Sequence, residues 1–271
     1  MQIEGKAAIV TGAGAGIGAA IAQRLVENGA NVTVSDINAE TASSSAAQLN
    51  EIRAGSAIGV GSDAADETAL RALIAQTEEA FGPVAFYFAN AGVGLGAGLD
   101  AEDQAWEIAW NVNVMAHVRA ARLLVPGWVE KGEGYFFSTA SAAGLLTQLG
   151  SPTYATSKHA AVGFAEWLRV TYGDKGVRVS CLCPMGVNTA LLNAGDDADE
   201  EASRIAAAAV KTSGRVLEPL EVADMVIEAI GDERFLVLPH PEVFDMYRHK
   251  GQDYDRWIAG MQRYRTSLET G

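Results

Sequence analysis

Two side chains near the middle of the chain have the types and the spacing needed to move a proton. Tyr154 and Lys158 lie four residues apart, in a stretch that begins with Ser151 and Pro152. Serine followed by proline is typical of the first residues of a helix, and residues four apart share one helical face. A free tyrosine titrates near pH ~10. A neighbouring ammonium group can supply part of the lowering of this pKa, and the cation of a bound nicotinamide can supply more. The pair therefore predicts a general base that takes a proton from an alcohol, and a general acid in the reverse reaction.

A serine upstream of this pair can hold the oxygen that reacts. Ser141 precedes Tyr154 by 13 residues and follows an apolar run that predicts a strand. Its hydroxyl can hydrogen-bond a substrate oxygen in both the alcohol and the carbonyl form. Ser138 and Thr139 are competing hydroxyls, which can instead bond the backbone at the end of the strand. No acid and histidine are placed to activate Ser141, so a hydrolase nucleophile is not expected.

A glycine-rich turn after the first apolar run predicts a dinucleotide site. The segment from Thr11 to Gly18 reads TGAGAGIG. Its glycines let the backbone approach a pyrophosphate and leave N–H groups free at a helix N-terminus. Asp36 lies 18 residues after Gly18. Its carboxylate can accept hydrogen bonds from the adenosine ribose and would repel a 2′-phosphate. Alternatively, Asp36 could be the N-cap of the next helix. Because no Arg or Lys lies in the turn or directly after Asp36, we expect NAD rather than NADP.

Two later segments extend this site. Asp63 and Ala64 follow the third predicted strand, where the carboxylate can accept from the adenine amino group or cap the next helix. The small residues of Asn90–Gly92 follow the fourth and permit a close approach to ribose and adenine, although alone they indicate only a turn. The cofactor-binding residues predicted on these grounds are Gly12, Gly14, Ala15, Gly16, Ile17, Gly18, Asp36, Ile37, Asp63, Ala64, Asn90, Ala91 and Gly92.

The elements that must position these groups alternate between short apolar runs and longer helical patterns. Predicted strands are 7–10, 31–35, 57–60, 84–88, 134–138, 178–182 and 235–238, and predicted helices lie near 17–28, 38–52, 66–80, 101–130, 152–172 and 218–230. This alternation predicts an α/β fold: a single-domain, Rossmann-like, doubly wound parallel seven-stranded sheet with helices on both faces, over residues 1–240.

Two stretches break the alternation. Residues 186–215 contain no clear strand and include the acidic run 196–201, which predicts a lid over the substrate. In 241–271, Tyr247, Tyr254, Met261 and Leu268 recur every seven residues, which predicts a helical tail packed on the same domain or on a partner subunit.

Composition excludes several classes of function. The 271 residues carry a net charge of −14, which disfavours nucleic acid and anionic membranes as partners. No apolar run approaches the ~18 residues of a membrane span, and the first residues lack the features of a signal peptide. Cys181 and Cys183 lie two apart in an apolar run, which favours buried thiols in a cytoplasmic protein over a disulfide. The scattered histidines argue against a metal site.

These motifs together resemble the short-chain dehydrogenase/reductase family over about residues 1–240. The match comprises the glycine turn, Asn90–Gly92, the Trp106 to Asn113 segment, Ser141 and the Tyr154–Lys158 pair. The resemblance implies that Lys158 also binds the nicotinamide ribose, and that Asn113 holds a water that relays protons from Lys158. It further implies that Pro184, Gly186, Val187 and Thr189 hold the nicotinamide end of the cofactor. Met185 stands where the family has glycine and is expected to narrow the pocket.

We therefore expect an NAD(H)-dependent oxidoreductase that interconverts a secondary alcohol and a ketone. A mostly apolar pocket predicts a neutral, fairly hydrophobic small molecule as substrate. Its predicted lining is Val93, Leu95, Ala143, Leu145, Gln148, Met185, Leu191 and Leu192. Two alternatives stay open: a 3-oxoacyl-thioester reductase of the same family, and a catalytically idle NAD-binding sensor or scaffold. The resemblance also implies a homodimer or homotetramer built on helices 101–130 and 152–172.

Overall fold

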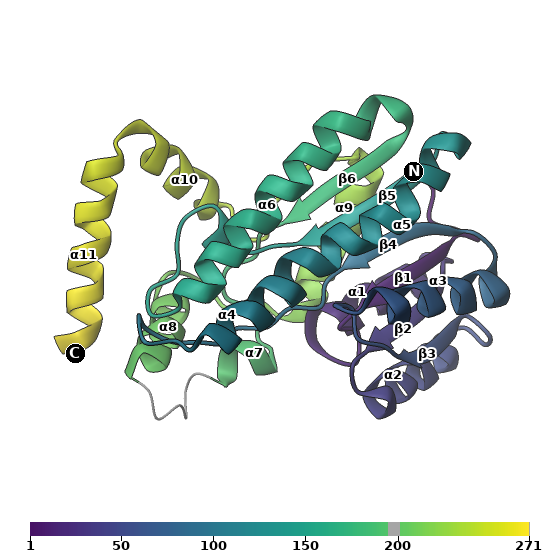
Figure 1. Cartoon of the computed structure of the whole chain (residues 1–271), viewed down its shortest axis with the longest axis horizontal. Helices are drawn as coiled ribbons and strands as arrows, with labels where there is room; N and C mark the ends of the chain where they lie inside the picture. Colours follow the sequence, from purple (N-terminus) through teal and green to yellow (C-terminus); the bar gives the residue numbers. More distant parts are fainter. Residues whose placement is uncertain (195–200, 271) are drawn as a thin grey trace.

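The central sheet consists of seven short strands that all run parallel. In the computed structural model, which describes residues 1–194 and 201–270, the spatial order is β3-β2-β1-β4-β5-β6-β7 (Figure 1). The strands are β1 (Ala7–Thr11), β2 (Asn31–Asp36), β3 (Ala57–Gly61), β4 (Val84–Ala89), β5 (Gly134–Thr139), β6 (Val177–Leu182) and β7 (Leu236–Val237). Each end lies within one residue of its predicted position, so the doubly wound α/β fold is confirmed.

Helices cover both faces of this sheet. The first eight are α1 (Gly16–Glu27), α2 (Ala39–Ile52), α3 (Glu67–Phe81), α4 (Asp103–Trp110), α5 (Ala116–Lys131), α6 (Pro152–Tyr172), α7 (Ala190–Asn193) and α8 (Glu201–Thr212), followed by α9 (Pro219–Asp232), α10 (Glu242–Gln252) and α11 (Tyr254–Thr270). Side chains of α1, α2 and α9 fill the core on one face, and those of α3, α5 and α6 fill the core on the other. The predicted helix 101–130 is interrupted by a π-helical turn, Asn111–Met115, between α4 and α5.

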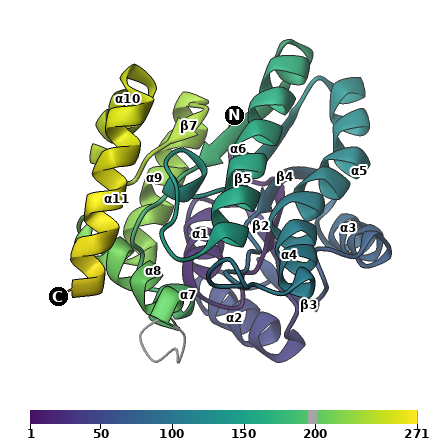
Figure 2. The same cartoon turned by 60° about the vertical axis from the view of Figure 1, so that its left-hand side comes forward.

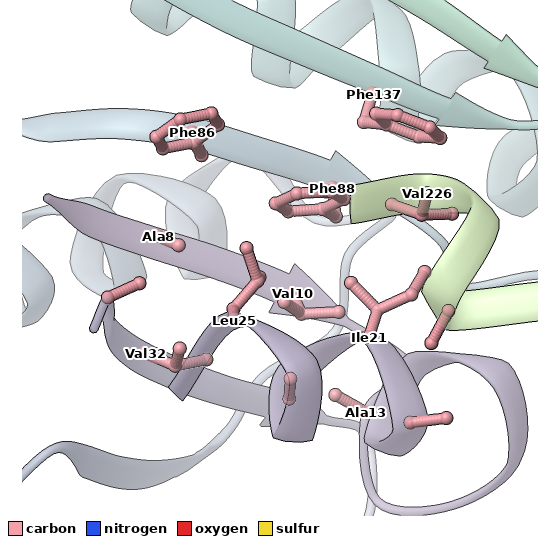
Figure 3. Packing of buried hydrophobic residues seen from close by; sticks show 14 of the residues in the cluster. Ala8, Val10, Ala13, Ile21, Leu25, Val32, Phe86, Phe88, Phe137 and Val226 are labelled. Atoms are coloured by element: carbon pink, nitrogen blue, oxygen red, sulfur yellow. The ribbon is translucent and has the colours of Figure 1, made fainter. Parts of the chain in front are cut away.

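Neighbouring residues of one strand lie in different cores because both faces of the sheet are buried. On β4, Phe86 and Phe88 point into the core beneath α1 and α9, and Tyr87 points into the opposite one. Figure 3 shows the first core, where side chains of β1, β4, β5, α1 and α9 meet. Stacked aromatic pairs between β4 and β5 add roughly 0.5–1.5 kcal/mol each beyond burial. Their ring centres are 5.3–5.7 Å apart, in Phe86–Tyr135, Tyr87–Phe136 and Phe88–Phe137.

The chain reverses its direction across the sheet between β1 and β4. From β1 it builds outward through β2 and β3, and it then returns to the other side of β1 to add β4 to β7. The loops that follow β1 and β4 therefore separate, and they leave a crevice at the carboxyl ends of the strands where ligands bind in folds of this kind.

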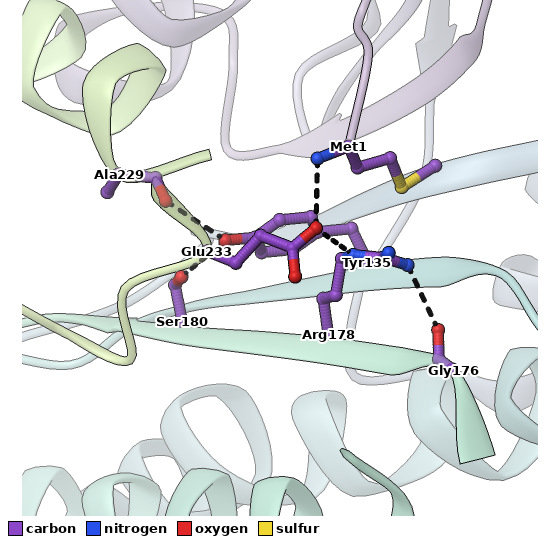
Figure 4. A network of polar contacts seen from close by, with 7 residues as sticks. All are labelled: Met1, Tyr135, Gly176, Arg178, Ser180, Ala229 and Glu233. Carbon is purple, nitrogen blue, oxygen red and sulfur yellow. Dashed lines mark hydrogen bonds and ion pairs between the residues drawn. The ribbon is translucent and has the colours of Figure 1, made fainter. Parts of the chain in front are cut away.

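A polar cluster joins Met1 to β6 and to the residue that follows α9 (Figure 4). The Met1 ammonium group lies 3.1 Å from Glu233 Oε1, and the Arg178 guanidinium donates to the same carboxylate. Beside them the Tyr135 hydroxyl bonds Ser180 Oγ at 2.8 Å. Burial acts to raise the pKa of Glu233, but the hydrogen bonds from Arg178 and Met1 hold it below its usual value.

The two irregular stretches both contain helices. Residues 186–215 include α7 and α8, while 196–200 of the predicted acidic run lie outside the described residues. The C-terminal stretch forms two helices that meet at Asp253, so the seven-residue recurrence from Tyr247 to Leu268 does not form one continuous stripe as predicted. None of the helices in the described residues is long and apolar enough to cross a membrane.

Candidate active site

A cavity of about 490 Å³ opens at the carboxyl ends of the strands. Segments that follow β1, β2, β4, β5 and β6 contribute to its wall, together with α6, α7 and α8. Among the predicted site residues it brings together Gly12, Ala15, Gly16, Ile17, Asp36, Asn90, Ala91, Gly92, Ser141, Gln148, Tyr154, Lys158, Pro184, Met185, Val187, Thr189, Leu191 and Leu192.

Two glycines of the turn at one end of the cavity, Gly12 and Gly18, have no space for a side chain. Gly12 has a φ of 61°, and a Cβ there would lie 2.9 Å from Ala91 Cα. A Cβ at Gly18 would lie 2.3 Å from the Gly12 carbonyl oxygen, so this glycine permits α1 to pack closely against the turn. Helix α1 begins at Gly16 with no side-chain cap and no acidic residue in its first turn. Its free N–H groups and positive dipole end are therefore available to an anion.

Asp36 lies at the end of β2, where its carboxylate forms part of the cavity wall. Its Oδ2 accepts from Gly14 N at 3.0 Å, and its Oδ1 accepts from Asn38 N at 3.0 Å. The alternative role as a helix cap is wrong, because Asn38 is the N-cap of α2 and accepts from Glu40 N. The carboxylate thus stabilises the glycine turn and presents a negative charge at the same end of the cavity.

Asn90 and Thr11 form a clamp between β4 and β1 that the sequence did not reveal. The Asn90 side chain donates to the Thr11 and Gly12 carbonyl oxygens at 3.0 and 3.2 Å. The Thr11 hydroxyl accepts from the backbone N–H groups of Asn90 and Ala91, at 3.0 and 3.1 Å. These four bonds hold the start of the glycine turn against the segment after β4, so Asn90 acts on the turn itself.

Tyr154 and Ser141 both form part of the cavity wall. Tyr154 lies in the first turn of α6, and Ser141 precedes a 3₁₀ turn, Ala142–Gly144. Burial raises the pKa of Tyr154 above its usual value, and a hydrogen bond with the Ser141 hydroxyl opposes this rise. In the protein by itself, the loss of solvation outweighs the stabilisation of the phenolate. Because the cation of a bound nicotinamide is expected to supply part of the lowering, a lowered tyrosine pKa in the complex stays a prediction.

Lys158 lies one helical turn beyond Tyr154 and is buried. Its Nζ donates to the Thr139 carbonyl oxygen at 2.9 Å and lies 5.6 Å from the centre of the Tyr154 ring. Burial lowers the pKa of Lys158 to about 8. A Cβ at Gly92 would lie only 3.3 Å from this Nζ, so glycine at this position leaves room for the ammonium group.

Asn113 is fully buried within the π-helical turn and does not line the cavity with its side chain. Its Oδ1 accepts from Val93 N and its Nδ2 donates to Val93 O, both at 2.9 Å, and Nδ2 also donates to Ser157 Oγ at 3.0 Å. The side chain therefore fastens the segment after β4 to α6. Its predicted role in a water relay stays a prediction.

The backbone at Met185 is held by a histidine that the sequence did not single out. Met185 N donates to His240 Nδ1 at 3.1 Å, and the other ring nitrogen bonds the Arg215 carbonyl oxygen at 2.9 Å. Glu233 is the non-glycine residue with a positive φ in the described part of the chain, so Met185 has an ordinary backbone conformation and does not require glycine. Its side chain lies against Gly214, where a Cβ would come within 2.5 Å of Met185 Cε.

Several predicted residues lie away from the cavity wall. Ile37 is 79% exposed, and Asp63 accepts from Ala65 N at 2.8 Å in a turn before α3. Ala143 and Leu145 are buried, because the 3₁₀ turn after Ser141 directs them into the protein. The predicted residues that do not form the wall are Gly14, Gly18, Ile37, Asp63, Ala64, Val93, Leu95, Asn113, Ala143, Leu145 and Gly186.

One face of α8 forms part of the cavity wall, and the sequence predicted none of its residues as pocket residues. Its residues recur at helical spacing and are mostly small. They are Ser203, Ala206, Ala207 and Val210. The signal was present in the sequence, but a stretch of alanines does not by itself indicate which face meets a ligand.

The described residues contain no group of His, Cys, Asp and Glu side chains that could hold a metal ion. Cys181 and Cys183 are buried free thiols whose sulfur atoms lie 3.8 Å apart, so their predicted burial is confirmed.

The chain is similar to several known dehydrogenases. The family model described as short chain dehydrogenase matches residues 6–200. The 1-deoxy-11-beta-hydroxypentalenate dehydrogenase of Streptomyces exfoliatus is 31% identical over 96% of this chain and 92% of its own length. The 2,5-dichloro-2,5-cyclohexadiene-1,4-diol dehydrogenase of Sphingobium indicum is 34% identical over 85% of this chain and 92% of its own length. A solved short chain dehydrogenase/reductase from Burkholderia phymatum in complex with NAD is 31% identical, with a TM-score of 0.86 over 94% of this chain and 96% of that one.

Proposed function

The chain belongs to the short-chain dehydrogenase/reductase family of oxidoreductases, and from this we propose that it is an NAD(H)-dependent enzyme that interconverts a secondary alcohol and a ketone. The observation that carries the proposal is the convergence of Ser141, Tyr154 and Lys158 on a cavity whose other end holds a glycine turn and Asp36.

The chain's own residues fit a dinucleotide. Gly12, Gly14 and Gly18 have no room for a Cβ atom, and the uncapped α1 offers N–H groups to a pyrophosphate. The Asp36 carboxylate would accept hydrogen bonds from the adenosine ribose hydroxyls and would repel a 2′-phosphate, which favours NAD over NADP. At the other end we propose that Pro184, Gly186, Val187 and Thr189 hold the nicotinamide and that Lys158 holds its ribose. The bound nicotinamide supplies the acceptor or donor of a hydride.

Three side chains have separate roles in the proposed proton transfer. Ser141 hydrogen-bonds the substrate oxygen in both oxidation states. Tyr154 takes the alcohol proton on its phenol oxygen during oxidation and returns it during reduction. The Lys158 ammonium group stabilises the phenolate form of Tyr154, from a position 5.6 Å from the ring centre. We propose that Asn113 connects Lys158 to solvent for the exchange of this proton.

The wall beyond Tyr154 favours a neutral, fairly hydrophobic substrate. Met185, Leu191, Leu192 and the alanines of α8 form an apolar surface there. The Gln148 amide is already engaged, since its Nε2 donates to the Ala206 carbonyl oxygen at 3.0 Å. The net charge of −14 disfavours a polyanionic substrate. The Sphingobium indicum relative is named as the dehydrogenase of a cyclohexadienediol, so we include cyclic secondary alcohols among the candidates.

We also propose that the enzyme is a homo-oligomer. Large apolar side chains are exposed along α4 and α6, among them Trp110 at 46%, Trp167 at 54% and Val170 at 84%. Single exposed apolar residues are ordinary, but a group of this size on neighbouring helices is typical of an interface. Light scattering of the purified protein would measure the mass directly, and a monomer would contradict this part of the proposal.

A substrate panel tests the function as a whole. Purified protein is mixed with NAD or NADP and with cyclic secondary alcohols, acyclic secondary alcohols and acyl-thioester substrates in turn, while the absorbance of the reduced nicotinamide is followed. We expect turnover of a neutral secondary alcohol with NAD. The thioesters are supplied in their 3-hydroxyacyl form, so that NAD or NADP can oxidise them. Turnover restricted to these thioesters with NADP would contradict the proposal, and binding of NAD without turnover of any substrate would favour a sensor.

A further inference from the structure

The C-terminal hairpin, formed by α10 and α11, lies beside the substrate end of the cavity. Both helices follow the segment that the family model matches. Figure 2 shows α11 running along α8, and the two helices pack against each other. Two of its side chains, Lys250 and Tyr264, make polar contacts with elements of the active site.

Lys250 is a buried cation without a carboxylate partner in the described part of the chain. The residue is 5% exposed. Its Nζ donates to the carbonyl oxygens of Leu145 and Leu146 at 2.8 and 2.6 Å. The rings of Tyr254 and Trp257 lie 5.4 and 5.0 Å from the same atom. Because a buried charge is costly unless polar groups or aromatic faces surround it, these contacts fix the position of the ammonium group.

The contacts of Lys250 connect the two elements that carry the reactive groups. Leu145 and Leu146 directly follow the 3₁₀ turn that begins after Ser141. His159 Nε2 lies 3.4 Å from the ammonium nitrogen, while its Nδ1 bonds the Ala155 carbonyl oxygen at 2.8 Å. His159 immediately follows Lys158 on α6. Lys250 thus lies between the Ser141 segment and the helix of Tyr154.

Tyr264 holds α8 from the side opposite the cavity. Its hydroxyl bonds the Ala209 carbonyl oxygen at 2.9 Å and Thr212 Oγ1 at 2.6 Å. On the other face of α8, Ala206 and Ala207 form part of the cavity wall. The position of that wall therefore depends on α11.

We propose that the C-terminal hairpin is a clamp on the substrate side of the active site, with Lys250 and Tyr264 as positioning residues. Lys250 fixes the Ser141 segment relative to α6, and Tyr264 fixes α8 over the cavity. In the described part of the chain, neither side chain bonds the glycine turn, Asp36 or Lys158. We therefore expect the clamp to act mainly on the affinity for substrate rather than on the affinity for the dinucleotide. The kinetic consequence rests on the function proposed above, but the structural consequence does not.

Hydrogen exchange on the protein alone tests the structural part. The backbone N–H groups of Leu145 and Leu146 both bond the Ala142 carbonyl oxygen, so they report on the segment that Lys250 holds. We expect Lys250→Met to speed exchange at these amides and Tyr264→Phe to speed exchange in α8, while exchange in β1 and α1 stays as in the wild type. The matched controls on α10 are Arg248→Met and Tyr247→Phe, which alter exposed side chains. Unchanged exchange in both Lys250→Met and Tyr264→Phe would overturn the proposal.

Kinetics then test the consequence for the substrate. We expect each variant to raise KM for the alcohol about five- to tenfold, the size of a lost hydrogen bond, with the Kd for NADH within about twofold of wild type. An unchanged KM, or a Kd for NADH that rises in parallel, would contradict the clamp. If Lys250→Met does not fold, Tyr264→Phe carries the test alone. A wild-type enzyme without turnover would refute the proposed function, and the exchange data would still decide whether the clamp exists.

Discussion

The Lys158 ammonium group lies 5.6 Å from the centre of the Tyr154 ring and is held there by the carbonyl oxygen of Thr139, at 2.9 Å. Burial raises the pKa of the phenol and lowers the pKa of the amine to about 8. The protein by itself therefore pushes both groups toward their neutral forms, which is a strained arrangement for two buried polar side chains. Such an arrangement is typical of sites selected for chemistry and costs stability.

Replacement of the lysine is expected to stabilise the protein while it abolishes catalysis. With a pKa of about 8 in the folded state against 10.5 unfolded, the buried ammonium costs stability at every pH below 8. Lys158→Met removes this cost and loses one hydrogen bond, for a net gain of about 2 kcal/mol at pH 7. The cost falls as the pH rises from 8 toward 10.5, so the gain should disappear by about pH 9.5. Denaturant unfolding measures the free energy of unfolding of Lys158→Met and of the control Lys131→Met, which alters an exposed side chain. A Lys158→Met variant that is less stable than wild type at pH 7 would contradict the prediction.

The charge at Asp36 is expected to select the cofactor. Asp36→Asn keeps a hydrogen-bond acceptor for Gly14 N but removes the negative charge, so the ratio of kcat/KM for NAD over NADP should fall by about tenfold or more. Glu40→Gln, an exposed carboxamide substitution in the first turn of α2, serves as the control and should leave the ratio unchanged. Initial rates with each dinucleotide measure this ratio. If the ratio is the same in Asp36→Asn and in Glu40→Gln, Asp36 does not select the cofactor.

His117 is expected to make the protein sensitive to acid. The ring is 1% exposed, its Nδ1 lies 3.0 Å from Ser138 Oγ, and burial together with the nearby Lys158 lowers its pKa to about 3. The unfolded chain binds a proton at this residue below pH ~6.5 and the folded chain does not, so stability is lost as the pH falls through that value. The contribution reaches about 2 kcal/mol at pH 5.

The variant His117→Gln isolates this effect. Its free energy of unfolding should fall less than that of wild type between pH 7 and pH 5, by about 2 kcal/mol, while His249→Gln at an exposed position should follow wild type. Identical pH profiles for wild type and His117→Gln would show that the buried ring is not responsible.

The alanine face of α8 is expected to set the size of the substrate. Ala207 is 7% exposed and forms part of the cavity wall, so Ala207→Leu should fill part of the substrate end. We expect KM for a bulky cyclic alcohol to rise about tenfold, with a smaller change for a short acyclic alcohol and none in the Kd for NADH. Ala208→Leu, on the same helix but outside the wall, is the control. A uniform loss for all alcohols would indicate a general distortion instead.

The sequence predicted the strands because most of them are apolar runs buried on both faces. It also predicted the Tyr154–Lys158 pair, since spacing along one helix fixes which residues share a face. The π-helical turn at Asn111–Met115 could not be foreseen, because its residues continue the helical pattern on either side. The break at Asp253 between α10 and α11 was missed for a similar reason: a recurrence every seven residues does not encode where a helix ends.

The substrate end was predicted less well than the cofactor end. Leu145 was placed in the pocket from its hydrophobicity, but the 3₁₀ turn after Ser141 rotates it into the core and leaves its carbonyl oxygen for Lys250. The sequence shows the charge of a neighbour but not the loss of solvent around the phenol, so it could not indicate that burial raises the pKa of Tyr154 in the protein by itself. Contacts between segments far apart in the chain, such as Lys250 with Leu146 or Tyr264 with Ala209, leave no local signal.

The phenol oxygen of Tyr154 is the atom on which the proposed chemistry depends, and its removal is the most direct measurement. Tyr154→Phe preserves the ring that packs in the cavity, so the Kd for NADH, measured by fluorescence titration, should stay within about twofold of wild type. Turnover of the best alcohol from the panel should fall by about a hundredfold or more, as expected for the loss of a group that transfers a proton. A variant that binds NADH normally and oxidises the alcohol at the wild-type rate would contradict the account.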